Sequence, residues 1–243
     1  MKAVILCAGQ GRRLLPYTES TPKCLLQLSG KFFIEWQIDA LKSLGIDQVI
    51  AVIGYDAVNI QSILKERYGD FTDTVFNPFF ELADNLASCW MAREHFHGDF
   101  ILLNGDTLFE PKIIQKLLAK NRLPITLATD EKEEYDEDDM KVISNDSNLL
   151  AVGKKLPLEQ VTGESIGIMH FNPEGAALFR DSVEAAMFNQ ETLAKWYLSI
   201  IDKLARNGKV DTCSIHGLEW TEVDFVHDLE NAEALTQKWK TQS

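Results

Sequence analysis

The sequence predicts an α/β fold built on a mostly parallel, mixed sheet, with helices on both faces and a small extra β element. Two observations support this. Over the first 130 residues, short apolar runs alternate with segments whose apolar residues recur at helical spacing, a repeated βαβ pattern. The chain has 243 residues, of which 45% are hydrophobic and 25% charged, so it can bury a full core as one large domain. Such a sheet places ligands at the carboxyl ends of its strands.

The amino-terminal elements follow from apolar runs and turn residues. The first strand is expected at Val4, Ile5 and Leu6, a β-branched and apolar run typical of a buried parallel strand. A short apolar piece at 25–28 and a turn at Ser29-Gly30 lead into the next elements. These are expected as a helix at 33–44, a strand at 48–53, a helix around 60–64, a strand at 74–76, a helix at 86–96 and a strand at 100–103.

The carboxyl-terminal half begins with an acidic run. In DEKEEYDEDD, residues 130–139, eight of ten residues are acidic, which is typical of a solvated loop and also compatible with a functional flap. Strands are expected at 141–144, 149–155 and 165–171, helices at 173–188 and 192–206, a strand at 210–215 and a closing helix at 228–240.

Composition restricts the partners. The formal charge of −13 argues against binding of nucleic acid or anionic membrane, since both require a basic face. The four cysteines form no C-x-x-C pair, so the sequence signals neither a zinc site nor a disulfide framework. With no signal peptide and no apolar run of about 18 residues, we expect a cytoplasmic protein with reduced thiols.

A phosphate-binding loop follows the first strand. Gly9 and Gly11 allow backbone N–H groups to approach a polyphosphate closely, and Gln10, Arg12, Arg13 and Lys23 suit the same anionic ligand.

Two better-known phosphate motifs do not match this loop. A dinucleotide fingerprint requires a third glycine where Leu14 stands, which disfavours a nicotinamide-dependent oxidoreductase. The P-loop pattern ends in Gly-Lys-Ser/Thr, but Gly30-Lys31 is followed by Phe32 and has Leu25 at the position of the required first glycine.

The loop resembles the signature of the nucleotidyltransferases that activate sugar phosphates and phospho-alcohols. The matching positions are Gly9, Gly11, Arg13, Leu14, Pro16, Thr18, Pro22 and Lys23. The resemblance implies a Rossmann-like fold of the nucleotide-diphospho-sugar transferase type. It also implies a single nucleotidyltransferase domain over residues 1–243, with the nucleotide bound by about 1–130 and the acceptor by about 131–243. Cys7 and Arg12 are mild departures from the family pattern.

The resemblance also implies roles for individual residues. Arg13 and Lys23 are expected to contact the triphosphate and the leaving pyrophosphate, and together with Asp106 they form the expected catalytic set. The expected nucleotide-binding residues are Leu6, Ala8, Gly9, Gln10, Gly11, Arg12, Arg13, Lys23, Asn85, Ser88 and Gly105. Asn85 and Ser88 would contact the base or ribose, although helix capping explains the same residues equally well.

Two aspartates far apart in sequence are the expected metal ligands. Asp106 follows the apolar strand ending in Leu102-Leu103, and Asp224 lies in a late strand. By the resemblance they hold Mg²⁺, which favours carboxylate oxygens together with substrate phosphates and water. The alternative for Asp106 is a turn aspartate that caps the next helix.

The acceptor site is expected to use Lys141, Lys154, Glu164 and Trp196. Surface charge is the alternative for the three ionisable residues. For Trp196 the alternative is core packing, since it lies among apolar residues at helical spacing between 193 and 204. Within the family, the sequence looks most like the cytidylyltransferases of phosphocholine, aminoethylphosphonate and inositol phosphate, which implies CTP and a small phosphorylated acceptor as partners.

Other functions stay open. One is transfer to a sugar 1-phosphate, and another is a non-catalytic nucleotide-sensing subunit. The retention of Arg13, Lys23, Asp106 and Asp224 together favours catalysis over sensing. The sequence is compatible with a homo-oligomer and does not decide the oligomeric state.

Overall fold

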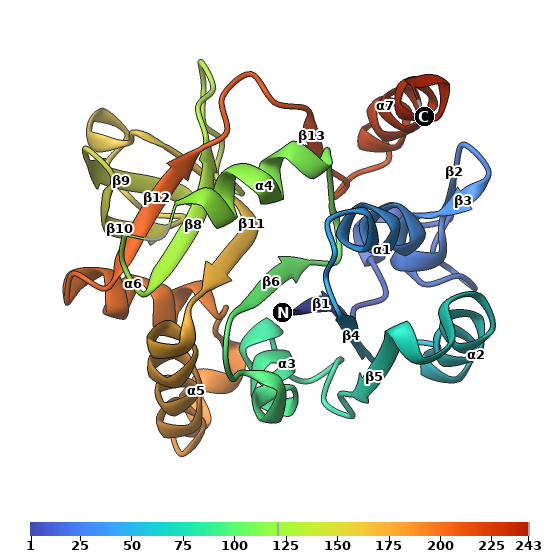
Figure 1. The fold of residues 1–243 in the computed structure, drawn as a ribbon, viewed down its shortest axis with the longest axis horizontal. Helices are drawn as coiled ribbons and strands as arrows, with labels where there is room; N and C mark the ends of the chain where they lie inside the picture. Colours follow the sequence, from blue (N-terminus) through green and yellow to red (C-terminus); the bar gives the residue numbers. More distant parts are fainter. Residues whose placement is uncertain (121, 243) are drawn as a thin grey trace.

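A nine-stranded mixed sheet forms the centre of the computed structural model, which describes residues 1–120 and 122–242 (Figure 1). The strand order is β5-β4-β1-β6-β11-β8-β12-β10-β9, and β10 and β11 run opposite to the other seven strands. The strands are β1 Lys2–Cys7, β4 Gln48–Ile53, β5 Thr72–Phe76, β6 Phe100–Asn104, β8 Ile125–Asp130, β9 Lys141–Asn145, β10 Asn148–Gly153, β11 Gly163–Phe171 and β12 Val210–Ser214. Strands from both halves of the chain therefore share one sheet.

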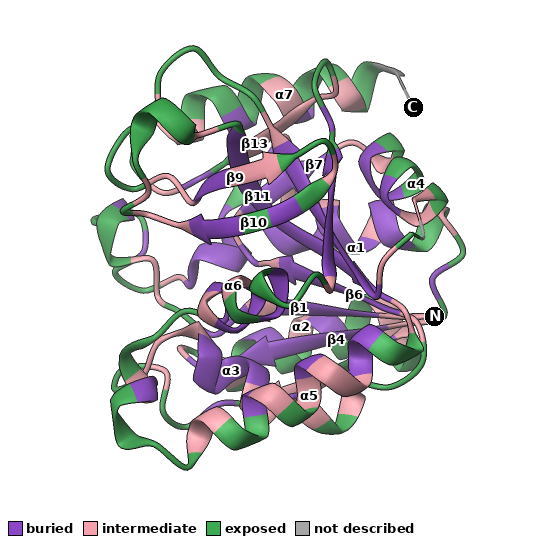
Figure 2. Ribbon diagram, turned by 90° about the vertical axis from the view of Figure 1, so that its left-hand side faces the viewer, coloured by how far each residue is buried: buried purple, intermediate pink, exposed green. Residues whose placement is uncertain are grey.

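Helices cover both faces of this sheet, as predicted. The helices are α1 Phe33–Ser43, α2 Ala57–Tyr68, α3 Asn85–Met91, α4 Pro111–Ala119, α5 Pro173–Met187, α6 Leu198–Arg206 and α7 Asp228–Gln242. Alternate strand residues belong to different cores: Ile101 and Leu103 of β6 pack with α1, α2 and α4, whereas Phe100 and Leu102 pack with α3, α5 and α6. Figure 2 shows the buried strands between helices whose outer faces are exposed. The predicted α/β class is confirmed.

The strands expected at 141–144, 149–155 and 165–171, which could have formed a small second sheet, instead extend the main sheet as β9, β10 and β11. Two short ribbons lie outside the main sheet. β2 (Gln27–Leu28) pairs with β3 (Lys31–Phe32), and β7 (Thr107–Phe109) pairs with β13 (Trp220–Glu222). Helix α7 lies beside the β2–β3 turn (Figure 1), where the Ser29 amide donates to Glu233 Oε2 at 2.8 Å. The carboxyl-terminal part of the chain thus returns to the amino-terminal part.

One expected helix is interrupted. In place of a continuous helix at 192–206, a 3-10 turn (Gln190–Ala194) is followed by extended backbone at Lys195, and α6 begins only at Leu198. The gap is stabilised by contacts with the start of α3. The carbonyl of Lys195 accepts from the Leu86 amide, and Asn85 Oδ1 accepts from the Tyr197 amide. These tertiary hydrogen bonds replace helical ones.

The helix expected at 86–96 is also shorter. It ends at Met91 and is followed by a separate 3-10 turn, Arg93–His95. The strand β8 and helix α4 were not expected individually.

All four cysteines are free and buried. Among the described residues, no helix has the length and apolarity needed to cross a membrane.

Candidate active site

The glycine loop after β1 is held by hydrogen bonds of its own. Gly11 has a φ of 81°, and a Cβ there would lie 2.9 Å from Lys23 Cβ, so both backbone conformation and space favour glycine. Thr18 Oγ1 donates to the Gly11 carbonyl at 2.7 Å, and Gln10 Nε2 donates to the Thr18 carbonyl at 3.1 Å. The Gln10 side chain therefore helps to hold the loop, and its expected contact with the nucleotide stays a prediction.

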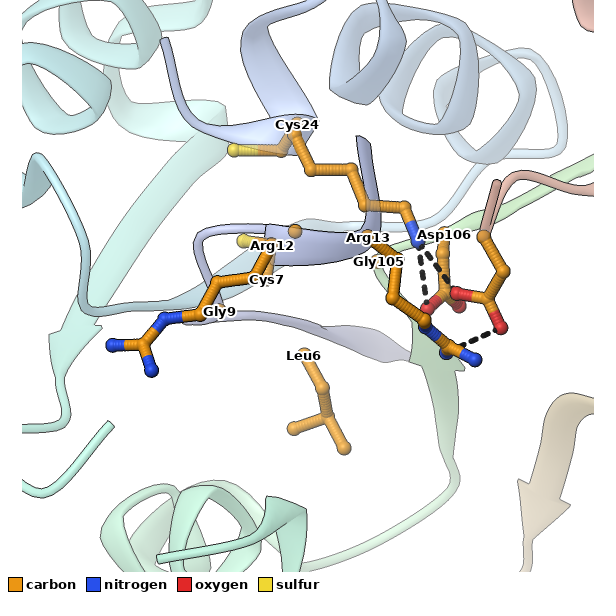
Figure 3. Close-up of a pocket in the computed structure, with 11 residues that line it drawn as sticks. Leu6, Cys7, Gly9, Arg12, Arg13, Cys24, Gly105 and Asp106 are labelled. Carbon is orange, nitrogen blue, oxygen red and sulfur yellow. Dashed lines mark hydrogen bonds and ion pairs between the residues drawn. The ribbon is translucent and has the colours of Figure 1, made fainter. Parts of the chain in front are cut away.

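This loop forms one wall of a cleft of about 310 Å³ at the carboxyl ends of β1 and β6 (Figure 3). Of the residues expected to bind the nucleotide or metal, the cleft is lined by Leu6, Gly9, Gly11, Arg12, Arg13, Lys23, Gly105, Asp106 and Asp224. Ala8 is buried, and its carbonyl accepts from the Tyr55 amide at 2.9 Å. The structure thus gathers most of the predicted set in one place.

The turn after β6 directs Asp106 into this cleft. The Gly105 amide donates to the Leu6 carbonyl at 2.9 Å, and a Cβ on Gly105 would lie 2.5 Å from that oxygen. Only glycine allows this close approach. From α1, Gln37 Nε2 donates to the carbonyls of Asn104 and Thr107 at 2.9 and 2.8 Å, and these two bonds hold the turn in place.

The β7–β13 ribbon brings Asp224 to Asp106. Thr107 is paired with Glu222, and the Val223 amide donates to the Asp106 carbonyl at 2.9 Å. As a result, Asp106, Glu222 and Asp224 each offer a carboxylate oxygen within 4.8 Å of the others. Glu222 was not predicted. Its spacing of two residues from Asp224, which places both on one side of an extended chain, was the signal available.

Lys23 lies between the two aspartates. Its Nζ is 3.2 Å from Asp106 Oδ2 and 3.1 Å from Asp224 Oδ1, and only 11% of its side chain is exposed. Burial disfavours the charged ammonium, but the two aspartate charges outweigh this effect and raise the pKa of Lys23 above its usual value. Arg13 Nη2 contacts Asp224 Oδ2 at 2.7 Å.

The three carboxylates fit a hard divalent cation. Asp106 Oδ1 is buried and has no hydrogen-bond partner among the described residues, so it has an unused acceptor. Desolvation in the cleft and the charges of Asp106 and Asp224 raise the pKa of Glu222, although the residue as a whole is exposed. Both observations match a cluster in which Lys23 compensates only part of the negative charge. Oxygen ligands of this kind suit Mg²⁺.

The two residues proposed to read the base differ in position. Asn85 lines a second cavity beside the cleft, and its Oδ1 holds the Tyr197 amide at 2.9 Å. Ser88 is buried and its hydroxyl is 3.0 Å from Asn77 Nδ2, which favours a structural role for it. Asp84 is the residue that caps α3, through the Asn85 amide.

The second cavity, of about 130 Å³, shares Arg13, Asp106 and Asp224 with the first. Three of the predicted acceptor residues, Lys154, Glu164 and Trp196, line it. Lys154 Nζ lies 2.9 Å from Asp138 Oδ1 and 4.7 Å from the centre of the Trp196 ring. Trp196 is 40% exposed, so it is not the core residue that its spacing allowed, whereas its neighbour Tyr197 is fully buried.

Lys141 has a different environment from the expected one. It is buried, and its Nζ donates to the carbonyls of Asp136, Asp139 and Lys154. It lines an outer cavity that shares Lys154 and Trp196 with the second cavity, but Lys141 itself does not line the second cavity. These bonds tie the acidic segment to β9 and β10, so the position of Lys141 indicates an anchoring role.

The acidic segment lies against the cleft through several ion pairs. Asp138 contacts both Arg13 and Lys154, and Lys132 contacts Asp139 Oδ1 at 2.7 Å and Glu164 Oε2 at 3.0 Å. The segment is therefore attached at the acceptor side, in contrast to a freely solvated loop.

Glu164 gives a pH-dependent prediction. Burial, opposed by Lys132 and reinforced by Asp139, raises its pKa to about 7, against about 4.3 in an unfolded chain. The folded state therefore holds this proton more tightly, so its stabilising effect is complete below about pH 4 and is lost as the pH rises to about 7.

Between pH 5 and 7, the free energy of unfolding should fall by about 2 kcal/mol more in the native protein than in Glu164→Gln. Urea denaturation at each pH measures this difference. The variant also loses the ion pair with Lys132, which offsets its free energy of unfolding from that of the native protein. Only the pH dependence of the difference in unfolding free energy between the two proteins is therefore informative. A difference that is constant with pH would contradict the prediction.

Comparison with known proteins decides the family. The MobA-like NTP transferase domain matches residues 3–166, which is more than half of the chain. This chain belongs to the MobA-like NTP transferase family. The resemblance of the glycine loop to nucleotidyltransferases is thereby confirmed.

Similar members of the family include cytidylyltransferases. The choline-phosphate cytidylyltransferase of Streptococcus pneumoniae is 39% identical over 110 residues, which cover 45% of this chain and 47% of that enzyme. The CTP:phosphoglutamine cytidylyltransferase of Campylobacter jejuni is 26% identical over 95% of this chain and 98% of that protein. This chain thus matches about half the length of the first relative and nearly all of the second.

Solved structures support the fold assignment. The inositol-1-phosphate CTP transferase from T. maritima superposes with a TM-score of 0.82 over 97% of this chain and 94% of that one, at 20% identity. At this identity the likeness concerns the fold, which is that of the predicted transferase type.

Two further residues that line the second cavity, Asn104 and Tyr197, were not among the predicted site residues. Asn104 Oδ1 accepts from the buried Tyr197 hydroxyl at 3.0 Å, and its amide packs against Gly167, whose φ is 71°. Neither Asn104 nor Tyr197 belongs to a recognisable motif. Their contact joins the end of β6 to the gap before α6, and only the tertiary structure shows it.

Proposed function

We propose that this protein transfers CMP from CTP to a phosphorylated or phosphonylated small alcohol, with release of pyrophosphate. The observation that carries the proposal is the position of Lys23 between Asp106 and Asp224, at the mouth of the glycine loop. A buried cation and a carboxylate cluster beside backbone N–H groups suit a triphosphate and its metal.

The chemistry needs little from the protein besides positioning. An anionic oxygen of the acceptor attacks the α-phosphorus in line and forms a new P–O bond. The bond from that phosphorus to the bridging oxygen breaks, and its electron pair leaves with pyrophosphate. Because the nucleophile is already ionised, no general base is required, and charge neutralisation supplies the catalysis.

Each cation then has a role. Arg13 and Lys23 line the nucleotide side of the cleft and neutralise charge on the departing pyrophosphate. Asp106 and Asp224, with Glu222 beside them, would hold Mg²⁺. When bound, the ion supplies positive charge to the reacting phosphates.

The choice of CTP rests on similarity. The two relatives compared above are named as cytidylyltransferases, and the T. maritima structure as a CTP transferase. Asn85, which lines the second cavity, is the side chain proposed to bond the base or ribose. The acceptor is proposed to enter through the same cavity, where Lys154 and Trp196 lie.

A matrix of substrates tests the proposal. Pyrophosphate release is measured for four nucleotides against phosphocholine, phosphoethanolamine, aminoethylphosphonate, inositol phosphate, glycerol phosphate and hexose 1-phosphates. We expect CTP to be preferred and chelation of divalent ions to abolish release.

Other outcomes identify the alternatives. Preference for a hexose 1-phosphate would favour a sugar-phosphate nucleotidyltransferase. Tight binding of a nucleotide with no release from any pair would favour a sensing subunit. Clear preference for another nucleotide contradicts the choice of CTP.

A further inference from the structure

Asp138 connects the two cations that are proposed to bind phosphate groups. Its Oδ1 is 2.9 Å from Lys154 Nζ, and its Oδ2 is 3.4 Å from Arg13 Nη1. Arg13 belongs to the glycine loop and Lys154 follows β10, so one carboxylate spans the cleft between its nucleotide and acceptor sides. The hydrogen bond from Lys154, with the charge of Arg13, lowers the pKa of Asp138, which is therefore ionised at neutral pH.

This ion pair lies where an acceptor must bind. Asp138, Lys154 and Trp196 line the same cavity as Asp106 and Asp224. An acceptor whose phosphate reaches the α-phosphorus must enter this space and compete with Asp138 for Lys154, while the triphosphate of the nucleotide competes with Asp138 for Arg13. In the free protein, the carboxylate therefore stands in place of the acceptor's anionic group.

Charge balance then constrains the rest of the acceptor. Once the acceptor's phosphate takes Lys154 and the triphosphate takes Arg13, Asp138 loses both counter-ions and faces a second anion. Because the Asp138 side chain is 52% exposed, water screens part of this repulsion, and the remaining cost is modest. The nearby Lys132 is already shared by Asp139 and Glu164. A positive charge on the acceptor itself would restore the lost pairing of Asp138.

We propose that Asp138 determines specificity for a zwitterionic acceptor by exchanging its internal partners for the acceptor's ammonium group. The phosphate or phosphonate pairs with Lys154, the triphosphate of the nucleotide pairs with Arg13, and the ammonium pairs with Asp138 near the face of Trp196. Each charge is paired before and after binding. An acceptor with a neutral polyol tail leaves Asp138 unpaired.

This inference rests on the proposed nucleotidyl transfer and adds a residue that selects among its acceptors. The competing interpretation is that Asp138 only fastens the acidic segment to the cleft. In that case its removal affects all acceptors alike, and this difference separates the two roles.

The test compares Asp138→Asn with Glu137→Gln, which neutralises the neighbouring carboxylate. Glu137 is not among the residues that line the cavity shared by Asp138, Asp106 and Asp224, and it lines the outer cavity instead. For each protein, kcat/KM is measured with phosphocholine and with glycerol 3-phosphate, which differ in the charge of the tail. Circular dichroism verifies that both variants are folded.

We expect the wild type to prefer phosphocholine. In Asp138→Asn, the ratio of kcat/KM for phosphocholine to kcat/KM for glycerol 3-phosphate should fall by about 5- to 10-fold. Glu137→Gln should keep the wild-type ratio. An unchanged ratio in Asp138→Asn, an equal change in Glu137→Gln, or a wild-type preference for glycerol 3-phosphate overturns the inference.

A binding measurement separates this inference from the proposed function. Calorimetric titration of phosphocholine and of glycerol 3-phosphate, into protein saturated with a non-hydrolysable CTP analogue, reports the Asp138 contact without turnover. If no pair of substrates releases pyrophosphate but phosphocholine binds and Asp138→Asn weakens it selectively, the proposed function fails and the inference stands. Equal weakening of both ligands overturns the inference whatever the turnover.

Discussion

Replacing Asp106 with asparagine should lower turnover on the order of 100- to 1,000-fold while the protein stays folded. The substitution keeps the size of the side chain and removes the charge that would hold the metal against the reacting phosphates. Asp106 Oδ1 has no hydrogen-bond partner among the described residues, and Asp106 Oδ2 contacts Lys23, which keeps its ion pair with Asp224 in the variant. The turn itself depends on backbone bonds of Gly105 and on Gln37, which the variant retains.

Pyrophosphate release under saturating CTP and acceptor measures the effect, with Asp73→Asn as the matched control. Asp73 is an exposed aspartate on the edge strand β5, and its local bond to the Thr74 amide needs only the oxygen that asparagine keeps. The control should retain wild-type turnover. Turnover of Asp106→Asn within a few-fold of wild type would falsify the assignment of Asp106 as a metal ligand.

The part of the site that was predictable from sequence is the part that local geometry dictates. A glycine loop after a buried strand has few ways to bind a ligand, so Gly9, Gly11, Arg13 and Lys23 could be placed together in the cleft from their spacing. Asp106 was predictable for a similar reason. It ends a neighbouring parallel strand, and such strand ends meet at one edge of the sheet.

The acceptor side was less predictable because it depends on packing between distant segments. The break before α6 exists because α3 supplies hydrogen bonds to it, and this break exposes Trp196 while burying Tyr197. Periodicity alone had placed both in one helix. Likewise, the acidic composition of 130–139 indicated solvent exposure, but it could not indicate that Asp138 would contact Arg13, 125 residues away.

Lys141 illustrates the limit of reading charge from sequence. A lysine after an acidic run suggests a free cation, but a buried ammonium must find acceptors, and here three carbonyl oxygens supply them. The same physical rule explains Lys23, whose acceptors are carboxylates that could instead bind a metal when substrate is present. The identity of the acceptor atoms therefore distinguishes Lys141, held by carbonyl oxygens, from Lys23, for which we propose a catalytic role.

Replacing Lys23 with glutamine should lower turnover by a similar factor, on the order of 100- to 1,000-fold, and also destabilise the protein. The stability effect arises because Lys23 is the buried cation that contacts both Asp106 and Asp224. Without it, carboxylates within 4.8 Å of one another lose their shared counter-ion. Because the aspartates keep some solvent exposure, we expect a loss of about 2 to 4 kcal/mol, toward the lower part of the range for broken buried pairs.

Urea denaturation in the presence of a chelator measures the stability term, and pyrophosphate release at a temperature where the variant is folded measures the catalytic term. Lys203→Gln is the control, since Lys203 is an exposed lysine on α6. Both effects come from one ammonium but through different partners, the carboxylates in the free protein and the phosphates in the complex. Loss of stability with normal turnover would mean that Lys23 only compensates the acidic cluster, and the proposed contact with the leaving pyrophosphate would then be wrong.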